Sequence, residues 1–141
     1  MPKLFALIAF ILATLAFPLS AQSDEAAQLK AQETIKNQID AFKSGDDVKA
    51  YSYAAPRVTQ FFPEVSAFMD MVKRGYQPVY NPQSYNFGRA KELSDGQVVQ
   101  EVLVTGPDGK PWTAIYTMIK SQNGDWLING VQIVPGDDSS A

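Results

Sequence analysis

The side chains that could do chemistry here are carboxylates, tyrosines and a few cations, because the chain contains no histidine and no cysteine. This removes serine–histidine and cysteine nucleophiles, imidazole and thiolate metal sites, and the usual general base of neutral pH. What is left is acid–base work by a buried aspartate, glutamate or tyrosine beside an arginine or lysine. The available charges are Asp70, Arg74, Arg57, Glu101 and Arg89.

These charges also have structural explanations. Asp70 and Arg74 are four residues apart, the spacing of an ion pair on a helix surface, and Arg74 also suits a helix C-terminus. No glycine-rich phosphate loop and no dinucleotide fingerprint occurs, so we expect no cofactor and no metal. The formal net charge of −3, without a basic cluster, argues against nucleic acid or an anionic membrane surface as the partner.

Aromatic residues and one glutamine are the best candidates to line a pocket for a small apolar ligand. Aromatics at helix or strand spacing are usually core, but tyrosine hydroxyls in an apolar wall can orient a ligand. Gln100 shares a strand face with Val98, Val102 and Val104, where an amide must find a partner or line a cavity, unless it reaches water at the strand end. The predicted cavity lining is Tyr51, Arg74, Tyr76, Tyr80, Gln100, Trp112 and Tyr116.

The last third of the chain supplies the framework for such a site. Three polar turns, at 94–96, 106–109 and 122–125, contain Asp-Gly or Asn-Gly pairs, which close tight hairpins. They separate extended segments that begin at Ser84 and continue as 97–105, 111–121 and 126–134, rich in β-branched and aromatic residues. Connections this short cannot make parallel crossovers, so the segments predict a four-stranded antiparallel meander.

Apolar residues occur on both faces of these strands. Trp112, Ala114, Tyr116 and Met118 oppose Thr113, Ile115, Thr117 and Ile119, and in the last strand we place Gln132 on the Trp126 face. A sheet with one wet face should segregate polar and apolar residues more cleanly. Helices covering one face and a second copy covering the other would explain the pattern, and so would scattered surface apolar residues.

The helical half precedes the strands. A helix is predicted from Ser23 to Gly45, a second over 48–55 ending before Pro56, a short turn over 57–62, and a third from Pro63 to Gly75. Residues 76–83 read as an irregular connector. We therefore expect an α+β fold in which N-terminal helices pack on the antiparallel sheet, as a single domain over 22–141.

The N-terminus has the pattern of a secretory signal peptide. Lys3 precedes an apolar run from Leu4 to Phe17, and the small residues Ser20 and Ala21 follow. The run is shorter than the roughly 20 residues that span a bilayer, so we predict cleavage after Ala21, a signal peptide over 1–21, and no membrane span in the mature chain. An uncleaved anchor is the alternative. The predicted location is the bacterial periplasm or the secreted fraction.

The order of motifs resembles a known family. The motifs are Gln38-Ile39-x-Ala41-Phe42, Ala50-Tyr51-x-Tyr53-Ala54-x-Pro56, Phe68-x-x-Met71-Val72-x-Arg74-Gly75-Tyr76, Pro78-Val79-Tyr80-x-Pro82 and Trp126-x-Ile128-Asn129-Gly130-Val131. Over about 33–134 they resemble the bacterial family called domain of unknown function 4864, within the nuclear transport factor 2-like (SnoaL-like, cystatin-like) superfamily.

The resemblance implies a curved sheet wrapped around helices, with a cone-shaped apolar cavity and dimerisation through the sheet. It implies no activity, and without histidine the acid–base pair of the superfamily's enzymes is at best half present. We therefore expect a non-catalytic module that binds a small apolar ligand. The alternatives are an envelope assembly subunit that forms a homodimer through its sheet, and a cavity enzyme that uses aspartate or tyrosine.

Overall fold

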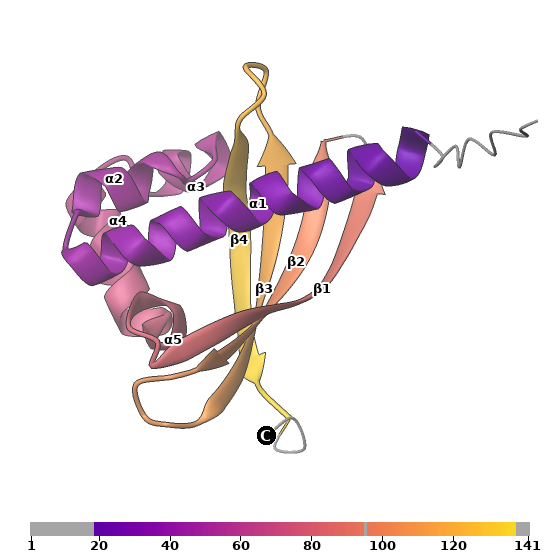
Figure 1. The fold of residues 1–141 in the computed structure, drawn as a ribbon. Helices are drawn as coiled ribbons and strands as arrows, with labels where there is room; N and C mark the ends of the chain where they lie inside the picture. The colour runs from indigo at the N-terminus through magenta and orange to yellow at the C-terminus, as the bar shows by residue number, and fades with distance from the viewer. Residues whose placement is uncertain (1–18, 95, 138–141) are drawn as a thin grey trace, which may run out of the picture.

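The computed structural model describes residues 19–94 and 96–137, which form five helices followed by four strands (Figure 1). The helices precede a single antiparallel sheet, so the fold is α+β as predicted. The elements are α1 (Leu19–Ser44), α2 (Asp47–Ser52), α3 (Pro56–Phe61), α4 (Val65–Gly75), α5 (Gln77–Tyr80), β1 (Ser84–Ser94), β2 (Gln97–Thr105), β3 (Pro111–Lys120) and β4 (Trp126–Pro135).

The sheet is the predicted meander, with strand order β1-β2-β3-β4 and every neighbouring pair antiparallel. Each of the three hairpin turns places its glycine at positive φ, which is 83° at Gly96, 77° at Gly109 and 91° at Gly124. Glycine has no Cβ to oppose this conformation, so these turns close tightly. The strands curve toward the helices (Figure 1).

A β-bulge in β4 changes which side chains face the helices. In β4, Met118 pairs with Ile128 but Thr117 pairs with Gly130, so Asn129 is an extra residue. Beyond it Val131 and Ile133 join the inner side of the sheet and pack against the core. The prediction that Gln132 shares the Trp126 face is therefore wrong, because a one-residue bulge inverts the alternation.

Helix α1 covers the inner face of the sheet. Ala31, Ile35 and Ile39 are fully buried against strand residues that include Val98 and Met118. The Thr34 hydroxyl donates a hydrogen bond to the Trp126 carbonyl, at 2.8 Å, and so joins α1 to β4. The helix begins at Leu19, upstream of the predicted Ser23.

The shorter helices close one end of the sheet and differ from the prediction at their boundaries. Helix α2 ends at Ser52 instead of residue 55, because the next three residues pair with β4. Helix α4 begins at Val65, two residues after Pro63, and the predicted connector contains the helical turn α5. A second core lies among these helices, where Phe42, Phe68, Met69 and Val72 are buried together with Ala41, Ala50 and Ala54.

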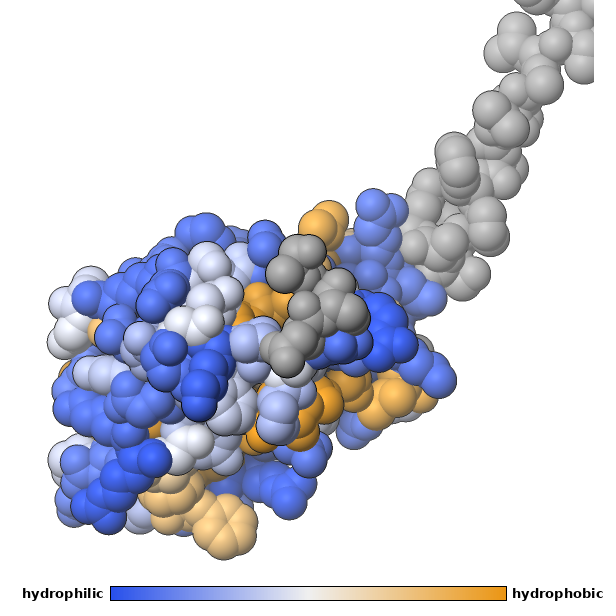
Figure 2. Space-filling view, turned by 90° about the horizontal axis from the view of Figure 1, so that it is seen from below, coloured by the Kyte–Doolittle hydropathy of each residue, from blue (hydrophilic) through white to orange (hydrophobic). Residues whose placement is uncertain are grey.

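The face of the molecule seen in Figure 2 is mostly hydrophilic, with hydrophobic residues gathered in limited patches. Figure 2 shows such patches from below, one of them beside the grey atoms. The large hydrophobic side chains that are exposed include Phe61, at 76%, and Leu103, at 42%. None of the helices in residues 19–94 has the combination of length and apolarity that a membrane crossing needs.

Candidate functional site

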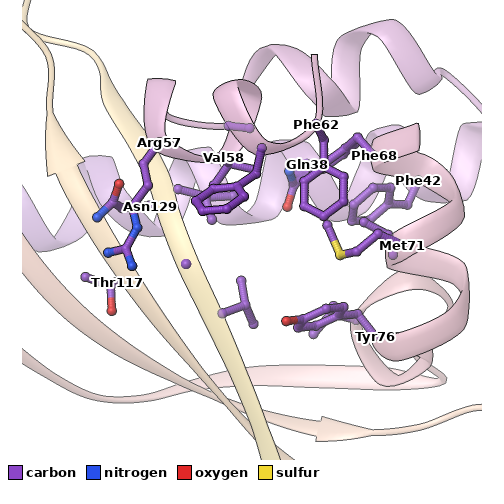
Figure 3. A pocket seen from close by; sticks show the side chains of 17 residues that line it. Gln38, Phe42, Arg57, Val58, Phe62, Phe68, Met71, Tyr76, Thr117 and Asn129 are labelled. Carbon is purple, nitrogen blue, oxygen red and sulfur yellow. The ribbon is translucent and has the colours of Figure 1, made fainter. Parts of the chain in front are cut away.

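An apolar pocket of about 410 Å³ lies between helices α3 and α4 and the edge strand β4 (Figure 3). Its volume is within the range of small-molecule sites, and most of its wall is aliphatic or aromatic, as such sites require. The lining residues are Gln38, Phe42, Ala54, Arg57, Val58, Phe61, Phe62, Phe68, Met71, Val72, Tyr76, Val79, Thr117, Ile128, Asn129, Gly130 and Val131.

The chain between α2 and α3 fixes the upper wall. The Ala55 N–H donates to the Ile128 carbonyl at 2.8 Å, and the Ile128 N–H donates to the Tyr53 carbonyl at 2.8 Å. This short parallel bridge attaches the segment to the free edge of β4. Because Pro56 follows at the first position of α3, the bridge sets where that helix starts and carries Arg57 to the pocket.

The opposite wall is held by polar contacts behind it. The Tyr51 hydroxyl donates to the Phe62 carbonyl at 2.6 Å, and the Tyr51 ring meets Phe68 edge to face at 5.3 Å. The buried Gln38 amide donates to the Ala50 carbonyl at 3.0 Å. Both bonds join groups of the protein itself and hold this wall from behind.

Polar groups gather at two places in the pocket. Arg57 extends from α3 toward Asn129 and Thr117, and Tyr76 points its hydroxyl into the cavity from the far side (Figure 3). Arg57 is exposed, whereas the other three side chains are half-buried. None of these four side chains forms a hydrogen bond or ion pair with the described part of the chain. They are therefore available to a ligand.

Of the seven residues predicted to line a cavity, the structure places Tyr76 on this pocket. Tyr51 does not line the pocket; it lies behind the pocket wall, where its hydroxyl donates a hydrogen bond to the Phe62 carbonyl. The ring of Tyr80 packs on the ring of Phe42, with 5.7 Å between the ring centroids. Arg74 is exposed near the end of α4. Trp112 lies beside the β2–β3 turn, where its ring N–H approaches the Asp108 carboxylate at 3.4 Å.

Gln100 faces inward as predicted, and its amide forms hydrogen bonds with backbone carbonyls of the sheet. It is fully buried, and its Nε2 contacts the carbonyl oxygens of Gly88 and Arg89 at 3.3 Å each and of Glu101 at 2.8 Å. Its Oε1 accepts a hydrogen bond from Gln32 on α1, at 3.1 Å. Gln100 thereby fills the irregular part of β1, between Phe87 and Ala90, where backbone carbonyls lack strand partners.

Tyr116 is fully buried in the core between α1 and the sheet. Its hydroxyl has no hydrogen-bond partner among the residues that the structure describes. Burial raises the pKa of this phenol, because the phenolate would lose its hydration, and the charge of Tyr85 raises it further. The side chain therefore stays neutral at ordinary pH and acts as core.

The charged residues considered for catalysis do not assemble in the pocket, apart from Arg57. Arg89 and Glu101 form a two-bond ion pair across β1 and β2, at 3.0 and 2.9 Å. The Arg89 guanidinium lowers the pKa of Glu101, which keeps that carboxylate ionised. Asp70 and Arg74 are both exposed on α4. Across residues 19–94 and 96–137, no group of three or more acidic side chains could hold a metal ion.

Sequence reasoning missed most of the pocket. Arg57 was recognised as a charge but not as a pocket residue, because its position depends on the pairing of the preceding segment with β4. Asn129 and Gly130 form the bulge, and a strand read by strict alternation does not reveal it. The adjacent Asn-Gly pair inside an apolar strand was the available signal.

A family match covers nearly all of the described chain. Residues 23–141 match the family described as Domain of unknown function (DUF4864), so the chain belongs to this family, as the motifs predicted. No curated protein and no solved structure matches the chain.

Proposed function

We propose that this protein is an exported, non-catalytic module that binds a small, largely apolar ligand in the pocket between α3, α4 and β4. The pocket carries the proposal. It has the volume and the apolar wall of a small-molecule site, and the side chains of Arg57, Tyr76, Thr117 and Asn129 have no partner in the described chain. The apolar run Leu4–Phe17 with the small residues after it supports export to the periplasm or the medium.

Binding is favoured over catalysis by the chemistry of the wall. The lining residues include one arginine and one tyrosine but no carboxylate, so a base to pair with them is missing there. Placement in the nuclear transport factor 2-like superfamily is part of the same proposal. The curved sheet packed on helices supports it, as does the apolar cavity at one end of the sheet.

Gly130 offers a direct test of the site. A Cβ added there meets no atom within 4 Å, and the residue has no positive φ, so valine should fit the fold. Gly130→Val would place methyl groups at the pocket wall and should weaken binding of a neutral fluorescent apolar probe about tenfold, or about 1.4 kcal/mol. Gly75→Val is the matched control, because Gly75 is equally open and lies outside the pocket.

The measurement is a probe titration of both variants, with urea unfolding to check that each remains folded. Equal probe affinity in wild type and Gly130→Val would reject this pocket as the binding site. Native mass spectrometry of the protein from its own host tests the rest of the proposal. We expect a polypeptide that starts at Gln22 and carries a small molecule lost on denaturation, whereas a chain starting at Met1 would contradict cleavage.

A second candidate function is assembly through the outer face of the sheet. Val99, Leu103, Ile115 and Ile119 lie on strand positions opposite the buried residues, and each is partly or fully exposed. The described helices contact the sheet from its other side (Figure 1). A homodimer that pairs two outer faces would cover these residues, and this supports the alternative of an envelope assembly subunit.

A further inference from the structure

We infer that the pocket selects amphiphiles with a single negative charge, an aliphatic carboxylate being the simplest, and that Arg57 binds the head group. The inference rests on the proposed binding function and names the class of ligand. Three observations carry it: the charge of the pocket wall, the donors grouped at one place in it, and the apolar surface beyond them.

The charge of the wall points to an anion. Arg57 is the one charged residue among those that line the pocket in the described chain. Both ion pairs in that part of the chain lie elsewhere, between Lys36 and Asp40 and between Arg89 and Glu101. The chain as a whole is acidic, with a net charge of −3, yet this cation has no carboxylate partner within residues 19–94 and 96–137. A ligand carboxylate would supply the missing partner.

The donors near Arg57 suit the oxygens of such a group. The guanidinium offers a fork of N–H donors that matches a carboxylate, and the Asn129 amide and Thr117 hydroxyl lie on the strands below it (Figure 3). Asn129 can face the guanidinium because the β4 bulge inserts it between Ile128 and Gly130. The bulge and the start of α3 thus bring the three donors to one place.

The rest of the wall accepts the tail. Phe62, Met71 and Val131 are among the side chains that continue the pocket away from Arg57. Burying methylene groups against them adds affinity without requiring further polar partners. A single cation matches a single negative charge, whereas a phosphate monoester carries about −1.5 to −2 near neutral pH. We therefore assign the site to a carboxylate amphiphile.

The experiment compares three ten-carbon ligands that share a tail: decanoate, decanol and decyl phosphate. Each displaces a neutral fluorescent apolar probe from the mature protein below its micelle concentration. We expect decanoate to bind about tenfold more tightly than decanol, as a charge-assisted contact at a partly exposed site allows. In Arg57→Gln the affinity for decanoate should fall about five- to tenfold, while the affinity for decanol stays the same.

Arg74→Gln is the control, because Arg74 is an exposed arginine of α4 that does not line the pocket. It should leave the preference for decanoate intact, and Arg57→Lys should retain part of it. Acetate, which has no tail, should not displace the probe at the same concentration. Sodium chloride should reduce the preference without changing the binding of decanol.

The outcomes separate this inference from the proposed function. Equal binding of decanoate and decanol to the wild type overturns the inference alone, because the apolar pocket then binds without regard to charge. An equal loss in Arg74→Gln overturns it as well, since the effect would come from net charge. Tighter binding of decyl phosphate overturns the assignment to a monoanion. Failure of all three ligands and of the probe overturns the binding function together with the inference.

Discussion

At the scale of single residues, Tyr116 and Tyr51 differ in whether the tyrosine hydroxyl forms a hydrogen bond. The Tyr116 hydroxyl is buried with no hydrogen-bond partner in the described part of the chain, whereas the Tyr51 hydroxyl donates to the Phe62 carbonyl at 2.6 Å. Tyr116→Phe should therefore raise the free energy of unfolding by about 1 kcal/mol, and Tyr51→Phe should lower it by about 1 kcal/mol. Urea unfolding measures both, and a loss of stability in Tyr116→Phe would contradict the hydrogen-bonding assignment.

The same tyrosine predicts how stability depends on pH. Burial raises the pKa of the fully buried Tyr116 above the value of about 10 in an unfolded chain. It also raises the pKa of Tyr85, which is only partly buried. Above that pH the unfolded state therefore holds fewer protons than the folded state, so stability is complete below about pH 10 and falls as the pH rises.

The expected slope of the free energy of unfolding is up to about 1.4 kcal/mol per pH unit for the fully buried Tyr116, and it is smaller for Tyr85, which solvent screens. Urea midpoints measured across this alkaline range should fall more steeply in the wild type than in Tyr116→Phe, which keeps only the Tyr85 contribution. Identical slopes in the two proteins would show that Tyr116 ionises as easily in the folded chain as in the unfolded one.

Residue-level prediction succeeded where strand alternation was regular. Gln100 was placed inward because its neighbours two residues away are valines, and the structure buries it there. Whether it lined a cavity or bonded to the protein could not be read from the sequence. That outcome depends on the irregular pairing of β1, which leaves the Gly88 and Arg89 carbonyls facing the Gln100 amide.

At the scale of elements, the β4 bulge decides which residues reach the core. Deleting Asn129 should remove the bulge and leave Val131 and Ile133 facing the core, because Ile128 and Gly130 would then be consecutive residues opposite Met118 and Thr117. We expect this deletion to cost less than about 2 kcal/mol of stability, because the core contacts after the bulge are kept and Gln132 stays outside.

Asn129→Ala is the control for the deletion, since it removes the side chain but keeps the number of residues. It should change stability by less than about 1 kcal/mol. Thermal or urea unfolding of both proteins makes the comparison. A deletion variant that fails to fold would mean that the residues after the bulge lose their pairing with β3 when Asn129 is removed.

The hairpins were predictable and the packing of the short helices was not. Asp-Gly and Asn-Gly pairs encode the turns locally, so the strand boundaries followed within a residue or two. The end of α2 at Ser52 depends on a non-local bridge between Ala54 and Ile128. The residues near Ser52 contain no local pattern that predicts this bridge. The pocket is built on that bridge, which is why its lining was largely missed.

At the scale of the whole molecule, the outer face of the sheet predicts association. If two copies pair through this face, the wild type should sediment as a dimer at micromolar concentration and Ile115→Lys should be a monomer. Leu29→Lys is the matched control, because Leu29 is 59% exposed on α1, away from the sheet face. A wild type that is monomeric at high micromolar concentration, with no bound protein, would contradict assembly.

The bond between Thr34 and Trp126 joins the first helix to the last strand, 92 residues later in the chain. Ala31, Ile35 and Ile39 of α1 are buried against residues of β2, β3 and β4, so the inner face of the helix is fully covered only when the last strand is in place. Folding must therefore close long loops before hydrophobic burial compensates for the lost entropy, which slows the rate. A chain whose first helix is completed only by its last strand stays open through most of its synthesis, which is the state that the proposed export would require.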